Sequence, residues 1–179
     1  MYPSRKQATL RKFFSGITEQ SFQTQVGVAD PPLVDYITDL LLRFIRMESV
    51  FQLRNAEGKR LHEVAELMHE AQTRTGEARR MVYRHIGDFT LFWAGVYPEA
   101  LGRLQGRNTK DCLLDYCNQG KRSYLLASSI SSESNAEENA VLERLSYEFE
   151  LCVHGLGAVR KEWERRDSEE APRGPWLIN

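Results

Sequence analysis

Three residues with metal-binding side chains recur at helical spacing: His62, Glu66 and His69. At 3.6 residues per turn they fall within an arc of about 60°, so a helix would place them on one face. Glu66 and His69 have the Glu-x-x-His spacing of di-iron carboxylate bundles, which need a second such pair. Glu150 and His154 are spaced one residue too far apart to supply it. The trio also lies about 100° from the apolar face of its own predicted helix, so a solvated surface is the alternative interpretation.

A second candidate is a ligand pocket or acid–base site formed by Tyr83, His85 and Asp88. Asp88 lies one turn after His85 and is placed to orient the imidazole ring, with Tyr83 close in sequence. The alternative is a core histidine whose ring nitrogens are satisfied by its neighbours. No serine or cysteine nucleophile stands in a matching pattern, so we expect no catalytic residue set. His85 shares its predicted inward stripe with Met81, Val82, Phe89 and Phe92.

The same helix begins with a group of arginines, Arg79, Arg80 and Arg84, which forms a candidate patch for an anion or an acidic partner. Neutralisation by nearby glutamates is the alternative. Lys and Arg total 24 and Asp and Glu total 25, a net charge of −1, which gives no general attraction to nucleic acid or anionic membranes. No apolar run approaches the roughly 20 residues of a membrane span, and no signal-peptide pattern follows Met1. We therefore expect no nucleic-acid or membrane partner, and a cytoplasmic location.

The hydrophobic periodicity predicts helices throughout, and strand alternation appears nowhere convincingly. Asp30 and Pro31 mark the start of one helix, while Gly95 and Pro98 are expected to end another. Pro98–Leu104 allows one short extra turn. The pattern predicts an all-α bundle of five to six helices with a long C-terminal helix, in a single domain over 1–166 with a short tail over 167–179. The expected helices start near Thr9, at Pro31, near 59, near 76 and near 109, and the last runs from a capping box at Ser134 and Glu137 to about Arg166.

The last predicted helix carries the most regular pattern. Such a heptad seam is typical of the central helix of an intramolecular bundle, and it also suits a dimer surface. Gly155 and Gly157 within it predict a close backbone approach or a bend. In the tail, Trp176, Leu177 and Ile178 form a candidate docking peptide, with folding back onto its own bundle as the alternative. The seam consists of Leu142, Leu145, Phe149, Cys152, Leu156, Val159 and Trp163.

The stretch from His85 to Glu99, together with Asp115–Gly120 and Tyr124, resembles a family of small, uncharacterised all-helical bacterial proteins over about residues 10–130. The resemblance implies a bacterial origin and an all-helical domain, and it implies no activity. Gly87, inside the apolar helix, is expected to let a neighbouring helix pack closely, such as the one that bears Gly120.

A regular packing pattern without a complete catalytic set favours a non-catalytic helical module for protein–protein interaction or assembly. We expect a protein partner or a homo-oligomer, and no cofactor. The alternative function is a metal- or small-molecule-binding helical bundle that uses His62, Glu66 and His69.

Overall fold

The computed structural model describes residues 5–45, 64–105, 109–130 and 136–170. Over these ranges it contains eight α-helices, one π-helical segment and no β-strand, which confirms the all-α prediction. The number of helices exceeds the five or six expected. The elements are α1 (Arg5–Ser21), η1 (Phe22–Val26), α2 (Pro31–Ile45), α3 (Val64–Thr73), α4 (Gly76–Val96), α5 (Pro98–Gln105), α6 (Thr109–Ser129), α7 (Ala136–Tyr147) and α8 (Phe149–Glu170).

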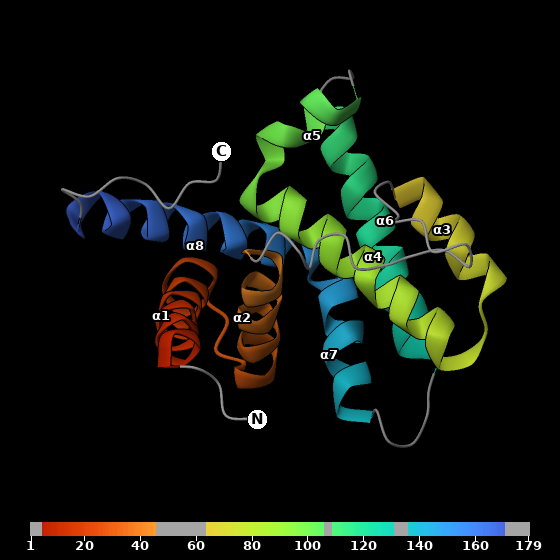
Figure 1. Cartoon of the computed structure of the whole chain (residues 1–179), viewed down its shortest axis with the longest axis horizontal. Coiled ribbons are helices and arrows are strands. Elements are labelled where there is room, and N and C mark those ends of the chain that lie inside the picture. The colour runs from red at the N-terminus through yellow and green to blue at the C-terminus, as the bar shows by residue number, and fades with distance from the viewer. Residues whose placement is uncertain (1–4, 46–63, 106–108, 131–135, 171–179) are drawn as a thin grey trace.

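Helix α4 lies at the centre of the fold (Figure 1). Helices α3, α6 and α8 all pack against it, and α6 also packs along α7. Helices α1 and α2 form a neighbouring pair, with α1 and η1 packed against α8. The apolar stripes of these helices therefore converge on one core, to which α2, α4, α6, α7 and α8 all contribute buried residues.

The local start signal at α2 acts as the sequence predicts. The helix begins at Pro31, and the Leu33 N–H donates to Asp30 Oδ1 at 3.4 Å. The preceding segment ends at Gly27, which adopts the left-handed conformation with φ of 73°. A residue without Cβ adopts that conformation without strain, so the chain reverses between η1 and α2 at this position.

Four glycines, Gly87, Gly95, Gly120 and Gly155, lie where a side chain of another element approaches the backbone. A Cβ at Gly87 would lie 2.6 Å from the Tyr124 ring of α6, which confirms the predicted close packing on the helix that bears Gly120. A Cβ at Gly155 would lie 2.5 Å from the Phe22 ring, which agrees with the close backbone approach expected from a glycine inside this helix. The prediction that Gly95 ends α4 is wrong: it is a buried helical residue, and its absent Cβ makes room for Leu156 of α8.

The single long C-terminal helix expected from the seam is instead two helices, α7 and α8, which meet at a corner at Glu148 (Figure 1). Backbone hydrogen bonds continue on both sides of the corner: Glu148 N–H donates to the Arg144 carbonyl at 2.8 Å, and Cys152 N–H donates to the Glu148 carbonyl at 2.9 Å. The helical hydrogen-bond ladder therefore resumes directly after the bend. Helix α8 also continues to Glu170, past the expected end near Arg166.

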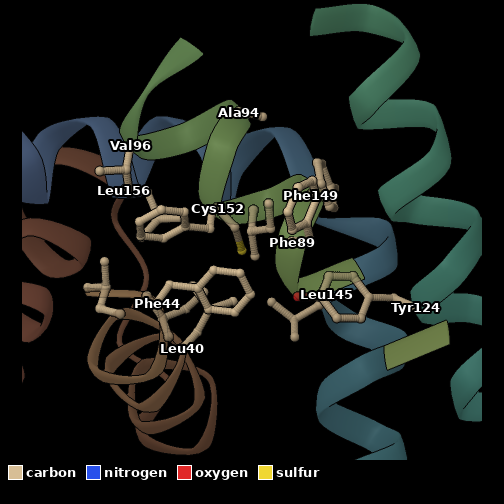
Figure 2. Close-up of a cluster of buried hydrophobic side chains, with 14 of the residues drawn as sticks. Leu40, Phe44, Phe89, Ala94, Val96, Tyr124, Leu145, Phe149, Cys152 and Leu156 are labelled. Atoms are coloured by element: carbon tan, nitrogen blue, oxygen red, sulfur yellow. The ribbon is translucent and has the colours of Figure 1, made fainter. Parts of the chain in front are cut away.

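The corner wraps the heptad seam around the chain's own core. Leu145, Phe149 and Leu156 are each 0% exposed. Figure 2 shows Leu145, Phe149, Cys152 and Leu156 clustered with Leu40 and Phe44 of α2 and with Phe89 of α4. The seam thus packs within the chain, in agreement with the intramolecular interpretation, and leaves little of itself for a coiled-coil dimer.

Candidate functional site

The centre of the fold holds a buried carboxylate, Asp88 of α4, whose residue is 1% exposed. The hydroxyl of Tyr36, from α2, donates to Asp88 Oδ1 at 2.6 Å, and the hydroxyl of Tyr124, from α6, donates to the same oxygen at 2.9 Å. The Arg43 guanidinium, also from α2, lies 3.0 Å from Oδ2. A buried carboxylate is tolerated when its charge and its lone pairs are matched, and here both oxygens have partners.

The two phenols and the guanidinium around Asp88 each keep one protonation state at neutral pH. Burial, followed by the charge of Asp88, raises the pKa of both Tyr36 and Tyr124, so both phenols stay protonated and donate to the carboxylate. Burial by itself lowers the pKa of Arg43, but the Asp88 carboxylate, together with the smaller influences of Tyr36 and Tyr124, outweighs it and the net shift is upward. At neutral pH the site therefore contains two neutral phenols and an ion pair.

Arg84 extends the network towards α7. Its Nε donates to the Tyr36 hydroxyl at 3.1 Å, its guanidinium lies 5.3 Å from the centre of the Tyr36 ring, and its Nη1 pairs with Glu138. We call Tyr36, Arg43, Arg84, Asp88 and Tyr124 the Asp88 cluster. It joins α2, α4 and α6 directly, and α7 through Glu138.

Arg80 is a second buried charge on α4, with its residue 2% exposed. Its Nη2 donates to Glu138 Oε2 at 2.6 Å and to Asn139 Oδ1 at 2.9 Å, and its Nη1 donates to Glu77 Oε1 at 3.1 Å. Of the predicted arginine patch, Arg80 thus points inward and shares Glu138 with Arg84. An anion would therefore compete with Glu138 for both guanidinium groups.

The third arginine of the predicted patch, Arg79, is directed to another partner. It donates from Nη2 to the Tyr83 hydroxyl at 3.2 Å and lies over the Tyr83 ring. Between these arginines, Met81 is 58% exposed, so its prediction as an inward residue is wrong. The buried ion pairs of Arg80 and the burial of Val82 set the inward face of this part of α4, which turns Met81 outward.

Tyr83, His85 and Asp88 have different contact partners in the described part of the chain. Asp88 takes its hydrogen bonds from Tyr36 and Tyr124, while Tyr83 receives its hydrogen bond from Arg79. The His85 ring stacks on Phe44 with centroids 6.1 Å apart, and burial lowers the pKa of His85 against the opposing influence of Asp88. Sequence reasoning found Asp88 but missed its partners Tyr36, Arg43 and Tyr124. The available signal was a carboxylate at a core position, which requires buried partners.

The predicted metal site is only partly within the described residues. On α3, Glu66 is half-buried and His69 is exposed, whereas His62 lies outside the described ranges. Among the residues that the structure describes, no three His, Cys, Asp or Glu side chains gather as metal ligands. The His62 site therefore stays a prediction. The candidate docking residues Trp176, Leu177 and Ile178 also lie outside the described residues.

The Asp88 cluster is suited to holding helices together. A general base needs a lone pair that a substrate proton can reach. The Asp88 side chain is 2% exposed, Oδ1 accepts two hydroxyl groups, and Oδ2 is paired with Arg43. The cluster fixes the relative positions of α2, α4 and α6, and its two arginine charges are balanced by Asp88 and by Glu138 of α7.

No protein-family model, curated protein or solved structure matches this chain. A functional assignment therefore depends on its own residues and their arrangement.

None of the helices in the described ranges has the length and apolar character that crossing a membrane requires.

Proposed function

We propose that this chain is a non-catalytic helical module for protein–protein interaction or assembly. The observation that supports this function is an exposed apolar surface at the corner between α7 and α8. Tyr147, the last residue of α7, is 71% exposed; Leu151 in the first turn of α8 is 38% exposed; and Leu125 of α6 is 44% exposed. We call these three residues the elbow surface.

Contacts between α6 and the corner bring the three residues into one region. Ser146, adjacent to Tyr147, donates from Oγ to the Lys121 carbonyl at 2.8 Å. The Lys121 ammonium also pairs with Glu150, adjacent to Leu151. Leu125 follows Lys121 by one helical turn and so lies on the same side of α6. The elbow surface is thus formed by two neighbouring segments of the fold.

The interior and the elbow surface differ in how their side chains are used. Inside, polar groups such as Asp88 and Arg80 are hydrogen-bonded to other residues of the chain. At the elbow, a large aromatic side chain is left mostly in water. Tyrosine is enriched among the residues that dominate protein interfaces, because it buries a large apolar area at low cost in rotamer entropy. This contrast favours binding over chemistry.

Site-specific photo-crosslinking in living cells tests the proposal. A photoreactive phenylalanine analogue replaces Tyr147, and the matched control carries the same group at Met81, another exposed apolar residue on a different helix. We expect a discrete covalent adduct of higher mass at position 147 and none above background at position 81. If both variants accumulate equally as folded protein and neither yields an adduct, the proposed function is wrong.

A further inference from the structure

We infer that the elbow surface binds a second copy of this chain in a two-fold symmetric contact, an inference that rests on the proposed function. Two exposed residues of opposite charge belong to the same helices as the elbow surface: Arg122 of α6 and Glu143 of α7. Arg122 lies one turn before Leu125, and Glu143 lies one turn before Tyr147. Within the part of the chain that the structure describes, neither residue makes an ion pair.

The arrangement of these charges is self-complementary. In a two-fold contact the same patch serves on both partners, so a residue i that meets j is matched by j meeting i. Arg122 of each copy can then face Glu143 of the other, while the nearby charges of Lys121 and Glu150 are already paired within each chain. A second copy carries both complementary charges and the apolar residues on the same patch. A partner of uniform charge would meet one favourable and one repulsive residue.

The size of the surface limits the strength of the contact. Its three apolar side chains expose on the order of 300 Å², whereas stable interfaces bury roughly 800 Å² on each partner. The contact is therefore a weak dimer that dissociates on dilution, and the charged rim contributes to its selectivity. Raising the salt concentration screens the charges of the rim and weakens the dimer further.

Sedimentation velocity over a wide range of concentration measures this association directly. We expect reversible dimerisation of the full chain, roughly tenfold weaker in Tyr147→Ser because a central aromatic anchor is lost. Met81→Ser removes another exposed apolar side chain, on a different helix, and leaves the dimer unchanged. Because Tyr147 is mostly in water, its replacement leaves the fold intact, which circular dichroism verifies.

Charge reversal tests the symmetry of the contact. Arg122→Glu and Glu143→Arg each weaken the dimer, and the double variant restores it, because both cross-copy pairs re-form with exchanged signs. A chain that stays monomeric at every concentration overturns the inference, as does a double variant no stronger than the singles. The mass of the photo-adduct at position 147 separates the two proposals. Twice the chain mass supports both, whereas any other mass keeps the proposed function and rejects the second copy.

Discussion

Asp88 is a charged residue in a position that helical periodicity assigns to the core, and its partners decide whether it stabilises the fold. Replacing it by asparagine keeps the shape but leaves the Arg43 guanidinium near a neutral group. We expect Asp88→Asn to lower the free energy of unfolding by about 3 kcal/mol, the cost of leaving a buried charge unpaired. Urea denaturation measures this loss.

A matched control exists at the surface. Asp39 of α2 pairs with Arg11 of α1, and its side chain is 50% exposed. Exposed ion pairs contribute about 0–1 kcal/mol, so Asp39→Asn is expected to have little effect. Equal effects of the two substitutions would show that the Asp88 cluster does not carry the stability assigned to it.

His85 gives the fold a pH dependence of known sign. Burial, together with the charge of Arg43, lowers the pKa of the folded-state imidazole, while Asp88 opposes the shift. The unfolded chain therefore binds a proton first as pH falls below about 6.5, and the stability associated with neutral His85 is lost in that range. We expect His85→Gln to lose less stability than the wild type between about pH 7.5 and pH 5.

Urea midpoints at the two pH values measure this difference. The loss of the stack on Phe44 affects the variant at both pH values and therefore cancels in the comparison. The exposed His154 of α8 supplies the control. His154→Gln is expected to leave the urea midpoint near the wild-type value, because its side chain is exposed. A pH dependence of His85→Gln that matches the wild type would show that another group governs acid stability.

At the level of the helices, the contact between α4 and α6 depends on the missing side chain of Gly87. Alanine normally stabilises a helix interior by about 1 kcal/mol relative to glycine. Here its Cβ would lie 2.6 Å from the Tyr124 ring and displace the tyrosine that hydrogen-bonds Asp88. We expect Gly87→Ala to destabilise the fold by about 1–3 kcal/mol, the range typical of overpacking.

Gly16 of α1 is the natural comparison, because no atom lies within 4 Å of the position its Cβ would take. Gly16→Ala is therefore expected to raise the thermal midpoint, while Gly87→Ala lowers it. If both substitutions stabilise the protein, the close approach of α4 and α6 is not a constraint on the fold.

Local signals predict individual helices better than they predict how the helices meet. Helix α2 begins at Pro31 after Asp30, as expected, because caps and periodicity act within a few residues. No proline or glycine near Glu148 predicts the corner there. There the Phe149 ring occupies the space over Gly120, and helical hydrogen bonding resumes at Cys152. A corner set by tertiary packing is absent from the local pattern.

The difference between local patterns and long-range contacts also explains how much of the Asp88 cluster could be predicted. Asp88 is recognisable as a carboxylate within an apolar stripe, and the glycine pattern predicts that α6 approaches α4 near it. Its hydroxyl donors, however, are 52 residues away at Tyr36 and 36 residues away at Tyr124. Periodicity counts both tyrosines as apolar residues of their own helices, so it predicts their burial without predicting which group their hydroxyls reach.

For the molecule as a whole, α8 links the N-terminal helices to the centre. Near its C-terminal end the Trp163 ring packs edge-on against Phe14 of α1, with centroids 5.2 Å apart. Nearer its start, Arg160 donates to the Val96 carbonyl at the end of α4 at 2.6 Å. Leu156 between Phe149 and Arg160 fills the space beside Gly95. Both parts of the core thus share one helix, which argues against independent folding units.

Continuous packing along α8 predicts cooperative unfolding of the whole chain. Trp93 lies on α4 against Phe92, and Trp163 lies on α8 against Phe14, so their fluorescence reports on two distant parts of the core. In a Trp176→Phe background, Trp163→Phe leaves only Trp93 and Trp93→Phe leaves only Trp163. Within each variant, fluorescence and far-ultraviolet circular dichroism are expected to give the same urea midpoint, because neither part retains a complete core once α8 detaches. A fluorescence midpoint for Trp163 clearly below that of the circular dichroism would instead show that α1, α2 and the end of α8 unfold as a separate unit, and the expected single domain over 1–166 would be wrong.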